Sequence, residues 1–164
     1  MALRVKDFDN GAKALKARMR RLLPRGVVGI YGERASAKPP EGKGRTVGEI
    51  AAAHEFGLGT VPMRSWLRAT MAARTKQVSA ALQEICVATI KGKGDAPQMM
   101  AQLAQAAAGW CKERIASGIA PELSARYLPR KLAKYPGATT PLIASGQMRQ
   151  SIAGELVSGG GKKK

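Results

Sequence analysis

Aromatic residues are scarce in this chain of 164 residues. Phe, Trp and Tyr together make up 4% of the sequence, and much of its 45% hydrophobic content is alanine. Alanine favours helices but removes little surface from water when it is buried. We therefore expect a thin helical core, a monomer of marginal stability and a protein that gains stability by binding further subunits.

Cysteine and histidine are nearly absent as well. With two cysteines, Cys86 and Cys111, and one histidine, His54, neither a disulfide framework nor a zinc site is predicted. We expect both cysteines to be buried on helices as small apolar side chains. We predict no cofactor and no metal.

Long apolar runs are missing too. No stretch approaches the roughly 20 apolar residues that cross a bilayer, and the first residues lack the apolar core of a secretory signal. We therefore expect no membrane contact and a chain that stays in the cytosol that made it.

The common catalytic motifs are also lacking. The sequence contains no G-x-S-x-G, no G-x-x-x-x-G-K-[ST] and no H-E-x-x-H, so we predict a protein without enzymatic activity. The glycines of residues 41–45 (EGKGR) precede a predicted helix N-terminus, where backbone N–H groups bind phosphate in other proteins. A flexible loop is the simpler interpretation of this segment.

What the chain has in excess is positive charge. Its 28 Lys and Arg against 11 Asp and Glu give a formal charge of +17. A charge run is more often a solvated face than a binding site, but an excess of this size favours contact with a polyanion, independent of sequence and sensitive to salt. The residues that we assign to such contacts are Lys38, Lys43, Arg45, Lys162, Lys163 and Lys164.

Hydrophobic periodicity predicts helices along most of the chain. Apolar residues at spacings of three and four predict three long helices, over residues 7–23, roughly 65–90 and 97–118. A capping box at Thr46 and Glu49 begins a short helix that ends at Gly57. The second and third long helices are joined by a short loop and should form an antiparallel hairpin.

Strands are predicted near both ends of the chain. A β-branched and aromatic run at 27–31 and a partly alternating segment at 151–157 are expected to pair. Segments rich in Pro or Gly at 33–45 and 119–140 are predicted to be loops, the first of them basic and flexible. The fold class is therefore α+β, a small antiparallel sheet packed by an N-terminal helix, a short helix and the hairpin. We expect one domain over 1–158 and a flexible basic tail over 159–164.

Two segments are similar to a known protein family. The first, 47–68 (VGEIAAAHEFGLGTVPMRSWLR), contains a His-Glu-Phe-Gly sequence followed by Pro-x-Arg-x-Trp-Leu-Arg, formed by His54, Glu55, Phe56, Gly57, Pro62, Arg64, Trp66, Leu67 and Arg68. The second, 141–152 (PLIASGQMRQSI), contributes Pro141, Leu142, Gly146, Arg149 and Ser151, with Ala144 where the family usually has Asp. Both resemble the tail-completion or neck proteins of long-tailed double-stranded DNA bacteriophages, also called head-to-tail joining or virion morphogenesis proteins.

The resemblance implies a structural virion protein made in the cytoplasm of a host bacterium. Such a protein forms a ring, a hexamer in the family, at the neck or head-proximal end of the tail, completes the tail and joins it to the head. The partners implied are the head-tail connector or adaptor, the tail terminator or tube proteins, and packaged double-stranded DNA. Two alternatives remain open, a tail terminator ring of the same region and a nucleic-acid-binding accessory protein without sequence specificity.

The residues of the first segment also have interpretations of their own. His54 is expected to be a buried imidazole bonded to a backbone carbonyl. Glu55 and Arg64 are expected either to pair across the connector at 57–60 or to form a surface salt bridge. Trp66 and Leu67 anchor the following helix in the core, unless Trp66 is instead a subunit contact.

In the second segment, Gly146 is expected to occupy a backbone position that a side chain would block, and residues 147–149 to lead directly into the last strand. The turn lies either at a subunit boundary or in an ordinary loop before a strand.

Overall fold

The computed structural model describes residues 16, 24–40, 42–91 and 93–157. In this part of the chain the fold is α+β, with one two-stranded antiparallel sheet and seven helices, as predicted. The predicted helix over 7–23, apart from residue 16, and the predicted tail over 159–164 lie outside the described residues.

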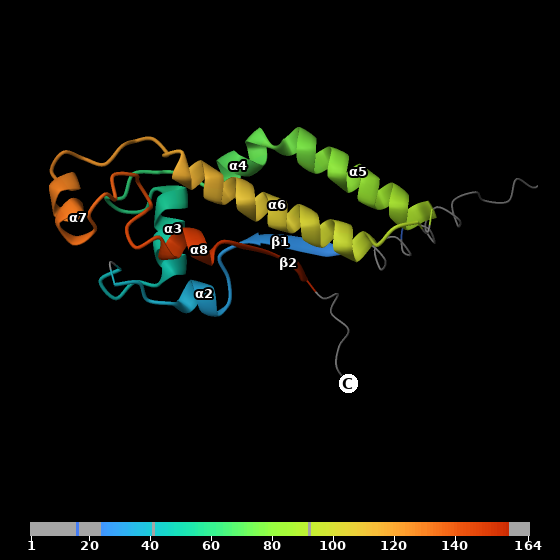
Figure 1. Ribbon diagram of the computed structural model, residues 1–164, viewed down its shortest axis with the longest axis horizontal. Helices are drawn as coiled ribbons and strands as arrows, with labels where there is room; N and C mark the ends of the chain where they lie inside the picture. The colour runs from blue at the N-terminus through green and yellow to red at the C-terminus, as the bar shows by residue number, and fades with distance from the viewer. Residues whose placement is uncertain (1–15, 17–23, 41, 92, 158–164) are drawn as a thin grey trace, which may run out of the picture.

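A helical hairpin forms the long body of the molecule (Figure 1). Helices α5 (Thr75–Lys91) and α6 (Ala96–Ala116) run antiparallel, and the Asp95 side chain caps α6 by accepting a hydrogen bond from the Gln98 N–H. Seven residues of α6 are buried, four of them alanines, whereas on α5 only Ile85 is buried. The core is therefore thin and rich in alanine, as the composition predicts, and Cys111 is buried within it while Cys86 is half-buried on α5.

The two strands pack against α6. β1 (Arg25–Gly29) pairs with β2 (Ala153–Val157) in the register Arg25 to Val157 and Gly29 to Ala153, so the predicted pairing of the chain ends is confirmed. Gly154 allows the close approach, because a Cβ at this position would overlap the carbonyl group of Ala104 on α6.

The short capped helix is α3 (Val47–Phe56). Thr46 and Glu49 form the predicted capping box, and Gly57 ends the helix in the left-handed conformation with φ 71°. Both local predictions are confirmed. The packing of α3, α6 and the segment before β2 forms the main core, which contains Val47, Ala51, Trp66, Ala108, Cys111, Ile115, Ile119, Met148 and Ile152.

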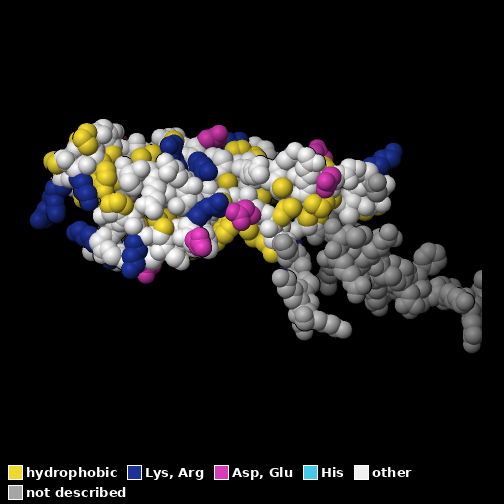
Figure 2. Space-filling model, turned by 60° about the horizontal axis from the view of Figure 1, so that its bottom comes forward, with side chains coloured by type: hydrophobic (Ala, Val, Ile, Leu, Met, Phe, Trp, Pro, Cys, Tyr) yellow, Lys and Arg dark blue, Asp and Glu magenta, His cyan; other side chains and the backbone are white. Residues whose placement is uncertain are grey.

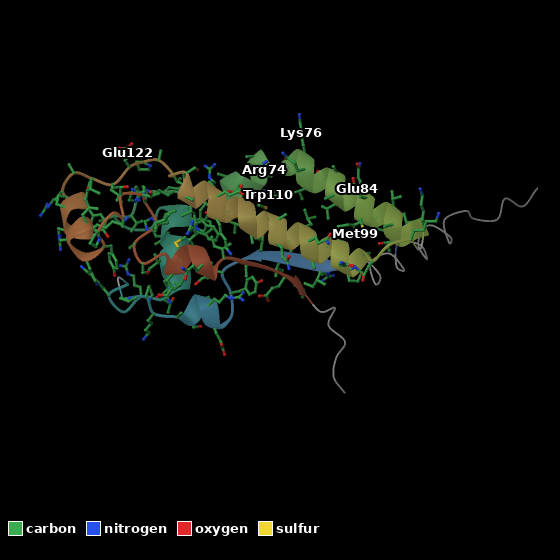
Figure 3. The ribbon with its side chains drawn as sticks, viewed as in Figure 1. Arg74, Lys76, Glu84, Met99, Trp110 and Glu122 are labelled. Carbon is green, nitrogen blue, oxygen red and sulfur yellow. The ribbon has the colours of Figure 1, made fainter. Side chains whose placement is uncertain are left out.

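The predicted helix over 65–90 is two helices. α4 (Arg68–Ala73) ends at Arg74, which leaves helical geometry with φ −105° and ψ 12°, and α5 begins at Thr75. The Thr75 hydroxyl donates to the carbonyl oxygens of Met71 and Ala72, a local bond that competes with the helical pattern. The Arg74 guanidinium lies 5.3 Å from the centre of the Trp110 ring on α6 (Figure 3), which holds the junction against the hairpin.

Both predicted loops contain helix, and so does the start of the predicted last strand. α2 (Glu33–Ser36) lies within 33–45, α7 (Leu128–Lys134) lies within 119–140, and α8 (Gln147–Ser151) precedes β2. Helices of four to seven residues are too short for periodicity to reveal, and they are stable only through tertiary contacts. In the predicted flexible loop, Pro39 and Gly42 are in fact buried.

Candidate functional site

The centre of the first motif is the buried carboxylate of Glu55 at the end of α3. Glu55 is 3% exposed. Its oxygens accept hydrogen bonds from the N–H groups of Trp66 (2.8 Å), Leu67 (2.9 Å) and Arg68 (3.0 Å), from the Ser65 hydroxyl (2.8 Å) and from Arg68 Nε (2.9 Å). These N–H groups begin α4 and have no partner within that helix. Glu55 therefore caps α4 from a different helix and fixes the angle between α3 and α4.

The hydrogen bonds keep this carboxylate ionised. Burial by itself raises the pKa of Glu55, but the N–H groups of Leu67 and Arg68 and the side chains of Ser65 and Arg68 outweigh burial and hold the pKa below its ordinary value. The cap is therefore a charged acceptor at neutral pH, and each of its hydrogen bonds is charge-assisted.

The predicted pairing of Glu55 with Arg64 is wrong, because Arg68 takes this place. Arg64 is buried, 4% exposed, and points away from the carboxylate. Its Nε donates to the Pro121 carbonyl at 2.6 Å and its Nη2 to the Glu122 carbonyl at 3.0 Å. Arg64 therefore fastens the segment after α6 to the motif.

Lys131 on α7 is a second buried cation. It is 5% exposed, and its Nζ donates to the Thr140 carbonyl at 2.6 Å. Burial, together with the nearby charge of Arg64, lowers the pKa of Lys131. Neither cation forms an ion pair within the described part of the chain.

His54 differs from its predicted role. Its Nδ1 is buried and has no hydrogen-bond partner among the described residues, whereas the prediction gave the imidazole a backbone carbonyl. Burial and the positive charge of Arg64 lower the pKa of His54 to about 4. The imidazole is therefore neutral at physiological pH. The backbone carbonyl of His54 accepts a 2.6 Å hydrogen bond from the Arg64 backbone N–H.

Trp66 belongs to the core. It is 4% exposed, and its indole Nε1 donates to the Ala51 carbonyl at 3.2 Å. Of the two interpretations that the sequence left open for Trp66, core packing is therefore supported and a surface contact is not. Leu67 is half-buried against the same core.

The connector between α3 and α4 leaves large apolar side chains in solvent. Phe56, Leu58 and Met63 are 57%, 53% and 57% exposed, and we call these three residues the apolar loop surface. The Arg68 guanidinium lies 4.8 Å from the centre of the Phe56 ring, its Nη2 contacts the Met63 sulfur at 3.9 Å, and the same Nη2 donates to the Glu55 carbonyl at 2.8 Å. Arg68, which is bound by Glu55, therefore contacts two of the three exposed side chains, Phe56 and Met63.

Sequence reasoning missed two of these three residues, Leu58 and Met63. The signal that would have found them is the presence of large apolar residues in a connector rich in Gly and Pro, since such a segment has no periodic face to bury them. Pro62, from the predicted set, is exposed in the same connector.

Most residues of the second motif are buried or half-buried. Pro141, Met148 and Ser151 are buried, and Leu142 has an unusual left-handed φ of 64°. Gly146 also has a positive φ, 81°, but a Cβ there would meet only Gln150 at 3.8 Å. The requirement at Gly146 is therefore conformational, and the prediction that a side chain would be blocked is wrong. Gly146 starts α8 and does not lead directly into a strand.

The structure brings the two motifs together. α3 packs against α8, and one core cluster contains Val47, Ala51 and Trp66 from the first motif with Met148 and Ile152 from the second. Segments about 90 residues apart in the sequence thus form a single packed unit that supports the apolar loop surface.

The predicted polyanion contacts are described in part. Lys38, Lys43 and Arg45 are exposed on the segment before α3, and residues 42–45 form a turn in which the Arg45 N–H donates to the Gly42 carbonyl at 2.9 Å. Lys162, Lys163 and Lys164 lie outside the described residues.

Within the described ranges no three His, Cys, Asp or Glu side chains gather as metal ligands. None of the helices described is both long enough and apolar enough to cross a bilayer. Comparison of the chain with protein family models, curated proteins and solved structures gave no match.

Proposed function

We propose that this chain is a structural virion protein of a long-tailed bacteriophage. In this proposal it forms a ring, six-fold by resemblance, at the neck or head-proximal end of the tail, completes the tail and joins it to the head. Its partners are further copies of itself, the head-tail connector or adaptor, and the tail terminator or tube proteins.

One observation carries the proposal beyond the motifs themselves. Phe56, Leu58 and Met63 are all more than half exposed, and Arg68, bound by Glu55, holds Phe56 and Met63 in a protein with a thin core. Fixed apolar side chains bind with a smaller loss of conformational entropy than mobile ones. Burial of such a surface between subunits is a non-covalent means of joining, and it requires no catalytic residue.

The test uses the virus that encodes the chain. Particles purified after growth should contain its peptides by mass spectrometry. The variants Leu58→Asp and Met63→Asp should fold but yield unjoined heads and tails by electron microscopy. Val87→Asp is the matched control, because Val87 is 46% exposed on α5, outside the apolar loop surface.

Normal infectious particles from both loop variants would contradict the proposed contact. Absence of the chain from purified particles would contradict the whole proposal. Circular dichroism of each purified variant separates loss of contact from loss of folding.

The first alternative function is that of a tail terminator ring in the same region of the virion. A protein that ends tail growth should give tails of abnormal length when it is missing. A protein that only joins should leave free tails of normal length. Measurement of tail length in particles lacking this chain therefore separates the two functions.

An accessory nucleic-acid-binding protein is the alternative from a different class, favoured by the charge of +17. A stable monomer by light scattering, together with nanomolar affinity for random duplex DNA and absence from the particle, would favour this function. Assembly on a purified tail or connector complex would favour the joining function.

A further inference from the structure

Two basic segments that are far apart in the sequence lie together at one end of the molecule. α7 and the segments 37–40 and 42–46 lie at the left end in Figure 1, and Lys134 Nζ on α7 donates to the Pro40 carbonyl at 3.3 Å. From the sequence alone, these regions are predicted to be separate loops. Their contact makes one continuous surface from them.

This surface carries six exposed cations, and we call it the basic end face. Figure 2 shows Lys and Arg side chains gathered at this end. Its members are Lys38, Lys43, Arg45, Arg126, Arg130 and Lys134, all exposed.

Acidic side chains offset only part of this charge. Between Glu122 and Glu155 the sequence has no Asp or Glu, and the six cations form no ion pair with any described residue. The Glu49 carboxylate lies close to Lys38 and Arg45 and offsets one positive charge, and Glu41, in the same segment of the sequence, lies outside the described residues. Six cations against these two carboxylates leave the basic end face with a net positive charge.

Two buried cations that interact electrostatically with each other add to the positive charge near α7. Arg64 and Lys131 donate only to backbone carbonyls, those of Pro121, Glu122 and Thr140, and Lys131 belongs to α7 itself. Carbonyl oxygens satisfy the donors but leave the net charge in place. Because low-dielectric surroundings screen a buried charge less than water does, both cations act on ligands at the surface.

We propose that the basic end face binds the phosphate backbone of double-stranded DNA. A duplex presents one negative charge for about every 1.7 Å of its axis, a density that matches a cluster of cations drawn from two elements. Long Lys and Arg side chains that contact phosphates read no base sequence, so the binding is independent of sequence and falls steeply with salt. This inference goes beyond the joining function and does not require a ring.

The experiment measures binding of the full chain to a random 30-base-pair duplex across a salt series. The variant K43Q/R130Q/K134Q removes three charges from the basic end face. The control K76Q/K91Q/K93Q removes three charges from α5 and its end, where Figure 3 shows Lys76 pointing away from α6. Both variants have a formal charge of +14, since 17 − 3 = 14.

Loss of each phosphate contact lowers the salt slope by about 1. We therefore expect the slope of log K against log salt concentration to be smaller in magnitude by about 3 for the end-face variant. Its affinity for the duplex at low salt should fall by at least about tenfold. The control should lose less than about threefold by the same reasoning. A second variant, K38Q/R45Q/R130Q, should behave like the first while retaining the hydrogen bond of Lys134.

Equal losses in the end-face and control variants would overturn the proposal, because net charge alone would then explain the binding. Absence of duplex binding by the unaltered chain at low salt, or equal affinity for poly-glutamate of matched charge or for single-stranded DNA, would overturn it as well. Failure here leaves the joining function intact, since that function is read from particle assembly.

Discussion

Trp66, two residues before α4, donates hydrogen bonds to Glu55 and to a second residue of α3. The Glu55 carboxylate accepts the Trp66 backbone N–H at 2.8 Å, and the Trp66 indole donates to the Ala51 carbonyl, one turn before Glu55 on α3. Because both bonds are buried, neither is exchanged for water without cost. These two hydrogen bonds fix the end of the connector between α3 and α4 against α3.

Replacement of Glu55 by Gln should destabilise the protein by about 2–4 kcal/mol, since an amide satisfies fewer of the converging donors and leaves Arg68 without its counter-charge. Urea unfolding followed by circular dichroism measures the change. The control is Glu84→Gln on the exposed face of α5, which should alter the free energy of unfolding by less than about 0.5 kcal/mol. Equal stability of the two variants would contradict the role of Glu55 as a buried cap.

His54 should make stability depend on pH between about 6.5 and 4. Its pKa is about 4 in the folded protein against 6.5 ordinarily, so the unfolded chain binds a proton in this window and the folded protein does not. The stabilisation is complete above pH 6.5 and is lost as the pH falls towards 4, by about 1–3 kcal/mol.

His54→Asn should flatten this part of the profile. A change in this pH range can be assigned to His54 because the chain contains no second histidine. Urea midpoints measured from pH 7 to pH 4 provide the test, and an unchanged slope in the variant would refute it. Glu55, whose folded pKa is depressed, adds its own loss of stability only below its ordinary pKa of 4.5, so the slope between pH 6.5 and 5 reports on His54.

Gly154→Ala should be among the most damaging single substitutions, at about 3 kcal/mol or more, because its Cβ would overlap the backbone of α6 at Ala104. Gly109→Ala is the matched control. Gly109 lies within α6 with open space where its Cβ would lie, so alanine should stabilise the protein by up to about 1 kcal/mol. Thermal unfolding of the two variants should shift in opposite directions, and shifts of the same sign would show that this close approach is not required.

Trp66→Ala should lower stability by about 3–5 kcal/mol, the usual cost of a large aromatic cavity. Any loss of particle joining should therefore follow from unfolding, since the side chain is not at the surface. Trp66→Phe refills most of the volume, loses the bond to Ala51 and should cost roughly 1–2 kcal/mol. A folded, fully stable Trp66→Ala protein with impaired joining would instead restore the subunit-contact interpretation.

The sequence alone determined the features that depend on local physics. The capping box at Thr46, the left-handed Gly57 and the hairpin are all confirmed, because each depends on propensity or on periodicity within a few turns. The predicted pairing of β1 with β2 is confirmed as well, although it joins segments far apart in the sequence. The α+β class followed from these elements.

Only the tertiary structure decided the partners of the charged residues. Whether Arg64 or Arg68 neutralises Glu55, whether Trp66 is buried, and whether α7 meets the segment before α3 all depend on how elements distant in the sequence approach each other. The shortest helices belong to the same category, since helices of four to seven residues owe their stability to what they pack against. Local patterns specify elements, whereas buried charge and exposed surface are properties of the assembled fold.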